Sequence, residues 1–324
     1  MKQLPPELWM QIAEAVVDED AVAFPAHHVI TRTLFALLTL TRATSKIARR
    51  LLLDHCLYID CAWRLHGLNL CLTEFPDTGA SIEKLFLAPF PSDGFSLEST
   101  INNESVVGGI HTLLDNIGPG LRKVVVDIPF RSHPPDEDIE TGLRPILRKV
   151  FTKLENVEEF VSVNDELYLD DEVDNTRQEL LWTRWSNLRR LGLYNLDLGR
   201  PDALRAITTK LPLLEVLVLA RADDLQEGIQ SLYRGMRTPL SVRIVNTPFG
   251  HDMALAERRE EFRKCLEPSA ETLEIMGESC RLVRFHRVDV DADVPAASTW
   301  DYDPISSCQC FLLAESIRRT LWQL

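Results

Sequence analysis

The amino-acid sequence predicts an α/β fold, a solenoid of strand–helix repeats preceded by a small all-helical module. Two observations lead to this prediction. The pattern L-x-x-L-x-L recurs along most of the chain with helical stretches between its copies, so strands and helices should alternate. Residues 1–53, by contrast, show only the helical spacing of apolar side chains. We therefore expect a helical module at 1–53, an irregular solenoid at 54–290 and a C-terminal capping segment with a helix at 291–324.

Composition limits the class of protein. Hydrophobic residues make up 45% of the 324 positions, enough for a sizeable core, and no apolar run approaches the roughly 20 residues that span a membrane. The net charge is −14, and because residues 1–53 hold six basic and five acidic side chains, the remainder carries −15. Nucleic acid, which needs a basic face, is therefore not an expected partner. Without an export signal, the seven cysteines are expected to be reduced thiols, in the cytoplasm or nucleus.

The helical module begins with two prolines, and Pro5 or Pro6 can take the first helical position, where the missing N–H costs nothing. Apolar residues then recur at helical spacing through Leu8 and Ile12, and the pattern resumes over 29–53 after an acidic loop. The cations expected at the end of its last helix, where they suit the helix dipole, are Lys46, Arg49 and Arg50. Two or three short helices bury little surface, so the module needs a partner within the chain or in another protein.

This module resembles an F-box. The resemblance lies in L-P-x-E-L-x-x-x-I, which begins at Leu4, and in L-L-x-L-x-x-A-x-x-K-I, which begins at Leu37. The loop between them is longer than usual, and Ala43 and Ile47 stand where the family usually has a valine and an aromatic residue. The resemblance implies docking on a Skp-type adaptor, and through it a cullin, by Leu4, Pro5, Pro6, Leu8, Ile12, Leu37, Leu38 and Ile47. The alternative is an ordinary helix pair that caps a larger domain.

The rest of the chain resembles leucine-rich repeats of the helical variety, so that the whole is similar to F-box proteins of the fungal type. The clear copies of the repeat are 82–87, 121–126, 157–162, 188–193 and 214–219, with degenerate copies at Leu240 (LSVRIV) and Ala270 (AETLEI). Helices are expected between them at 108–117, 143–154, 203–211 and 256–266. A mixed α/β domain with a parallel sheet would show a similar alternation. A terminal helix with Phe311, Ala314, Ile317 and Leu321 on one side should cap the repeats.

The repeat register predicts a target-binding surface. The first, fourth and sixth positions of each copy should face the interior, and the third, fifth and seventh should face outward, because strand side chains alternate. Four fifth positions form what we call the apolar ladder: Phe86, Val125, Val161 and Val218. The other residues assigned to target binding are Lys84, Lys123, Asp127, Arg190 and Tyr194. An exposed apolar surface usually binds a partner, but a segment of the same chain could equally cover the ladder.

No sequence motif indicates catalysis, a cofactor or a metal. The three aspartates of DVDAD (289–293) lack the glycine and glutamate of a calcium loop, and Cys308-x-Cys310 lacks a second pair at zinc spacing. The resemblances instead imply a substrate-recognition subunit of a Skp–cullin–F-box ubiquitin ligase, which binds the adaptor with one end and an unknown protein target with the other. The alternatives are a repeat scaffold without a ligase role and, third, an enzyme whose site is assembled from loops.

Overall fold

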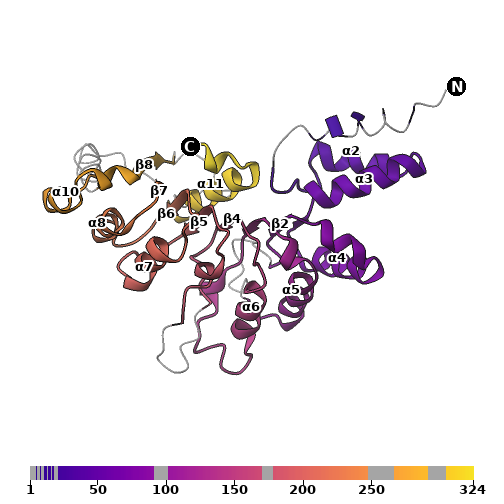
Figure 1. Ribbon diagram of the computed structural model, residues 1–324. Helices are drawn as coiled ribbons and strands as arrows, with labels where there is room; N and C mark the ends of the chain where they lie inside the picture. Colours follow the sequence, from indigo (N-terminus) through magenta and orange to yellow (C-terminus); the bar gives the residue numbers. More distant parts are fainter. Residues whose placement is uncertain are drawn as a thin grey trace.

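The computed structural model describes residues 5, 8, 11–12, 14–15, 17, 21–90, 101–169, 178–246, 266–290 and 304–324. Its centre is a parallel sheet of eight strands, which lie in the sheet in the same order as in the chain (Figure 1). The strands are β1 (Tyr58–Ile59), β2 (Lys84–Leu87), β3 (Lys123–Val126), β4 (Glu159–Ser162), β5 (Arg190–Tyr194), β6 (Val216–Ala220), β7 (Leu240–Asn246) and β8 (Val283–Asp289). The α/β prediction is confirmed.

Helices follow one another along one side of this sheet (Figure 1). They are α4 (Ala62–Glu74), α5 (Glu104–Ile117), α6 (Leu143–Phe151), α7 (Pro201–Thr209), α8 (Leu225–Gly235) and α10 (Ala270–Met276). Short 3-10 turns join them: η1 (Pro76–Ser81), η2 (Gly118–Gly120), η3 (Phe130–Ser132), η4 (Leu181–Arg184) and η5 (Gly277–Leu282). The helices predicted at 108–117, 143–154 and 203–211 are confirmed as α5, α6 and α7. The helix predicted at 256–266 lies, apart from Leu266, outside the described residues.

The predicted alternation of side chains is confirmed in the five clear repeats. In β5, for example, Leu191 and Leu193 pack in the core shared with the helices, and Leu188 precedes them on the same side. The intervening positions point to the opposite face, where they form a second apolar cluster. Both faces of the sheet are therefore largely buried at β2 to β6, which explains why these strands read as almost continuous apolar runs.

The two degenerate repeats differ from the prediction. In β7 the register pairs Val242 with Leu217 and Ile244 with Leu219, so the copy begins one residue before Leu240. The copy at Ala270 is wrong, because this segment forms α10, capped by the Ser269 side chain. Apolar residues three apart fit the first turn of a helix as well as L-x-x-L, which explains the misassignment. The strand that completes the sheet is β8.

The face opposite the helices is covered by the end of the chain, helix α11 (Pro304–Arg318) and the turn η6 (Thr320–Trp322) (Figure 1). Val22 and Ala23 pack in the same cluster. The prediction that the terminal helix caps the end of the repeats is wrong, since α11 contacts β3 and β6 in mid-sheet. Its most buried residues are Cys308, Leu312 and Ser316, a stripe one position away from the predicted one. Leu321 follows in η6 and is buried, as predicted.

Polar contacts fix this terminal segment to the sheet. Glu159 on β4 accepts hydrogen bonds from the Arg319 Nε at 3.0 Å and from Arg190 Nη1 at 2.8 Å. Arg319, which follows α11, has a left-handed backbone (φ 61°) that turns the chain into η6. Burial raises the pKa of Glu159 above its usual value although Lys123 and Arg190 oppose this, and burial lowers the pKa of Arg319. The N–H of Val22 donates to the carbonyl of Ile317 at 2.8 Å, which joins residues 21–24 to the same cover.

The N-terminal module contains α2 (Val29–Leu38) and α3 (Arg42–His55), in agreement with the two or three helices expected. The His28 side chain caps α2, and the Thr41 side chain caps α3 by accepting the N–H of Thr44 at 3.1 Å. A small core of its own holds the pair together: Ala21, Phe24, Ile30, Leu34 and Leu51. Since α3 continues to His55, Lys46 and Arg49 lie in its first two turns, and their expected place at the end of the helix is wrong.

Candidate functional site

The N-terminal module exposes apolar side chains along much of its length. The exposed ones among the described residues are Leu8, Ile12, Val29, Phe35 and Leu40. Side chains of this size on so small a module lie outside its own core, which is made by the inner faces of α2 and α3. Exposed apolar side chains mark an interaction site where they form a contiguous patch. These five residues are therefore candidates for contact with another protein.

The structure places the residues assigned to adaptor binding at three kinds of position. Pro5, Leu8 and Ile12 are exposed. Leu37 and Ile47 are half-buried against the small core of the module, so their role in the fold is clear and only part of each side chain is accessible. Leu38 is half-buried and lines a pocket described below. Leu4 and Pro6 lie outside the described residues.

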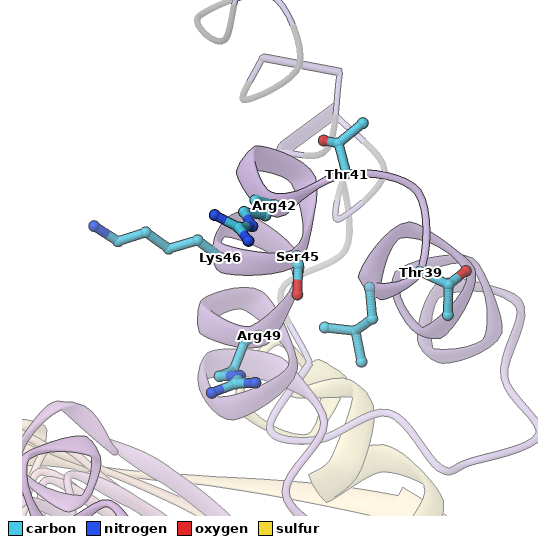
Figure 2. A pocket seen from close by; sticks show the side chains of 7 residues that line it. Thr39, Thr41, Arg42, Ser45, Lys46 and Arg49 are labelled. Carbon is cyan, nitrogen blue, oxygen red and sulfur yellow. The ribbon is translucent and has the colours of Figure 1, made fainter.

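A pocket of about 520 Å³ lies between the end of α2 and the first turns of α3. Its lining residues are Leu38, Thr39, Thr41, Arg42, Ser45, Lys46 and Arg49. Figure 2 shows Arg42, Lys46 and Arg49 following one another along α3, with Thr39 on the neighbouring helix. Sequence reasoning missed this site. The spacing R-x-x-x-K-x-x-R could have indicated it, because this spacing places three cations on one face of a helix.

Among the described residues, the cations of the pocket lack the carboxylate partners that the neighbouring Arg50 has. Arg50, one position further on, pairs with Glu14 at 2.7 Å and lies 4.0 Å from Asp54. Within the described part of the chain, neither Arg42 nor Lys46 pairs with a carboxylate. The Arg49 guanidinium lies over the Phe75 ring at 5.6 Å from its centroid, an interaction that leaves its charge uncompensated. The pocket is therefore a concentration of positive charge in a chain of net charge −14.

The apolar ladder does not form an open surface. Phe86, Val125, Val161 and Val218 are all buried, in one cluster with Leu312, Leu321 and Trp322 of the C-terminal segment. At the same level of β5, Gly192 has no side chain, and a Cβ there would lie 3.5 Å from Leu321 and 3.2 Å from Val161. The prediction that the ladder is open for a target is wrong, and the alternative, a cover from the same chain, is confirmed.

The other residues assigned to target binding also contact this cover or the strands beside it. Tyr194 is buried in the cluster, and Lys84 donates to the carbonyl of Ala21 at 3.2 Å. Arg190 binds Glu159, and Lys123 lies near enough to oppose the rise that burial causes in the pKa of Glu159. Asp127 accepts a hydrogen bond from Asn164, and burial raises the pKa of Asp127 to about 6. All of them are half-buried or buried, so their expected exposure on an open face is wrong.

Among the described residues, no group of three histidine, cysteine or acidic side chains could hold a metal ion. Cys308 is buried against the sheet while Cys310 is exposed, and Asp291 and Asp293 lie outside the described residues. None of the helices described has the length and apolar character needed to cross a membrane.

Comparison with known proteins adds no assignment: no protein-family model matches the chain, and neither does any curated protein.

Proposed function

We propose that this protein is the substrate-recognition subunit of a cullin-RING ubiquitin ligase of the Skp–cullin–F-box kind. In this proposal the N-terminal module holds a Skp-type adaptor, and through it a cullin, while the rest of the chain holds a protein target in the cytoplasm or nucleus. The observation that carries the proposal is the exposure of Leu8 and Ile12, the two apolar residues of L-P-x-E-L-x-x-x-I that the resemblance assigns to the adaptor. The protein itself catalyses no reaction, since the ligase supplies the chemistry.

We further propose that the sheet is a leucine-rich-repeat-like solenoid. Sequential strand order supports this, because every strand pairs with the strand that follows it in the chain. Each repeat then contacts only its neighbours, which is the arrangement of stacked repeats. The apolar ladder is no longer part of the proposed target surface, since the C-terminal segment occupies it.

A pull-down with a recombinant Skp-type adaptor tests the proposed function. Leu8→Asp and Ile12→Asp each place a charge in an interface that would otherwise be apolar, which costs several kcal/mol. The adaptor should be recovered with the unaltered chain and lost with either variant. Circular dichroism should be unchanged, because both side chains are exposed in the isolated chain.

Leu213→Asp is the matched control. Leu213 is 42% exposed, against 41% for Leu8, but it lies in the loop between α7 and β6. It should therefore leave adaptor recovery as it is. Recovery that persists with Leu8→Asp and Ile12→Asp, or that falls equally with Leu213→Asp, would contradict the proposed docking surface.

One observation favours the second candidate function, a repeat scaffold without a ligase role. Ala23 and Val22 are buried on the sheet face beside α11, and Phe24 belongs to the core of the module, so the module is attached to the sheet as a cap would be. If the unaltered chain recovers no adaptor at all, the scaffold becomes the better assignment.

A further inference from the structure

We propose that the pocket between α2 and α3 binds an acidic segment of the Skp-type adaptor, whose carboxylates pair with Arg42, Lys46 and Arg49. The inference rests on the proposed function, because it specifies the chemistry of the adaptor surface that the module holds. It assigns a role to residues that the F-box resemblance leaves without one. The apolar contacts of the proposed function would then be accompanied by an electrostatic contact next to them.

The geometry of the pocket favours an anionic ligand. Arg42, Lys46 and Arg49 are spaced by four and three residues, so they stand on one face of α3 (Figure 2). Like charges at this spacing destabilise a helix, and among the described residues no carboxylate offsets them. The side chain of Thr41 already caps the first turn of α3, so the charge comes from the three side chains and not from free backbone N–H groups.

The rest of the lining fits a peptide better than an isolated ion. Leu38 provides an apolar wall, and the hydroxyls of Thr39 and Ser45 can donate to carboxylate or carbonyl oxygens. A volume of about 520 Å³ is room for several side chains. Leu38 is also one of the residues assigned to adaptor binding, so the pocket is continuous with the proposed adaptor surface.

The charge distribution selects the class of partner. Residues 1–53 carry a net charge of +1 and the remaining residues −15, so a nucleic acid or an anionic membrane would be repelled by most of the molecule. A short acidic segment of a protein carries fewer negative charges and can approach the pocket alone, so the repulsion it meets is smaller. Complementary charges of this kind raise the association rate and make it depend on salt.

Titration calorimetry with the recombinant adaptor tests the inference on the full chain. Arg42→Ala and Lys46→Ala should each weaken binding by about 2-fold to 5-fold, the range for exposed ion pairs. A variant that combines Arg42→Ala and Lys46→Ala should respond less to salt: raising the salt concentration should weaken binding to the unaltered chain more than binding to this double variant, since salt screens the pairs that the variant lacks. Arg32→Ala is the control, because Arg32 is an exposed cation on α2 that does not line the pocket.

Zero-length cross-linking gives an independent readout. A carbodiimide joins the Lys46 amine to a carboxylate in direct contact, with loss of one water, and mass spectrometry should find the resulting link to an aspartate or glutamate of the adaptor. Lys46→Arg should abolish the link and preserve affinity, because the charge remains. If the unaltered chain binds no adaptor, the proposed function and this inference both fail. If it binds, and Arg42→Ala and Lys46→Ala bind as well as Arg32→Ala, only the acidic pocket ligand is refuted.

Discussion

Replacement of Phe86 by alanine should destabilise the fold strongly, because the C-terminal segment covers the apolar ladder. Phe86 is 2% exposed, and its ring stacks on Tyr58 with centroids 4.2 Å apart. Removing a buried phenylalanine ring leaves a cavity and typically costs about 3–5 kcal/mol of unfolding free energy. Urea denaturation followed by tryptophan fluorescence measures this cost as a fall in the midpoint at unchanged slope.

Phe35→Ala provides the matched control. The same ring is removed, but Phe35 is 53% exposed on α2, so the unfolding free energy should change by no more than about 0.5 kcal/mol. Equal effects of the two substitutions would refute the covered ladder. Phe86→Ala should also leave adaptor recovery unchanged, since the residue lies on β2 and not on the module.

Two further predictions concern the register and the C-terminal segment. Leu191→Ala should lower the unfolding free energy by about 2–5 kcal/mol in thermal or urea denaturation, because Leu191 packs in the core with the helices. Arg189→Ala removes only a surface ion pair with Glu215 and should cost less than about 1 kcal/mol. The reverse ranking would contradict the register. Arg319→Ala should lower the unfolding free energy by about 1–3 kcal/mol and speed amide exchange in α11, since the Arg319 side chain is 12% exposed and bonds to Glu159. Arg318→Ala should do neither, because its side chain is 71% exposed. Equal behaviour of the two variants would argue against this anchor.

The repeat pattern predicted the strands of the parallel sheet correctly in the clear copies, because the alternation of strand side chains and the spacing of the leucines agree there. In LRRLGL, strand alternation and the spacing of the leucines both place Leu188, Leu191 and Leu193 on one face, and the structure has them there. In the copy at Ala270 the pattern did not distinguish a strand from a helix. Its apolar residues suit a helical turn and a strand equally, and Ser269 provides the helix cap that a search for strands overlooks.

The cover of the ladder could not be predicted from local patterns. Glu159 and Arg319 are 160 positions apart in the chain, and neither sits in a motif that names the other. The sequence did contain one indirect signal, the apolar character of the fifth positions, which solvent would not favour. Apolar fifth positions are expected whether a partner protein or a segment of the same chain covers them. Only the structure distinguishes these two alternatives.

The basic pocket was missed for a different reason. Lys46 and Arg49 were assigned to the end of a helix, where cations are common and need no further explanation. Only the observed bounds of α3, Arg42–His55, place them in its first two turns, beside Arg42 and the end of α2. The bounds of a helix thus separate an ordinary dipole interaction from the basic pocket proposed above.

The buried Asp165, in the loop after β4, should make the stability of the protein depend on pH. One oxygen of the buried Asp165 carboxyl accepts the N–H of Leu167 at 2.8 Å and of Tyr168 at 3.1 Å, while the other has no partner among the described residues. Burial raises the pKa of Asp165 to about 7, with Glu166 adding to the effect and Arg131 opposing it. Asp165 has an ordinary pKa of 3.8 in the unfolded chain. Between the two pKa values the folded state therefore holds a proton on Asp165 that the unfolded chain has released.

Between about pH 4 and pH 7 the folded protein binds the extra proton, so stability should fall as the pH rises through this window, by up to about 1.4 kcal/mol per pH unit. Asp165→Asn keeps one oxygen for the two backbone N–H groups and removes the ionisation. Urea midpoints at pH 5, 6, 7 and 8 should show the stability of the variant rising relative to the unaltered chain as the pH increases, whatever constant cost the amide adds. Asp77→Asn, at an exposed position, should show no such trend. A difference that stays constant from pH 5 to pH 8 would mean that the Asp165 carboxyl does not carry the proton in the folded state.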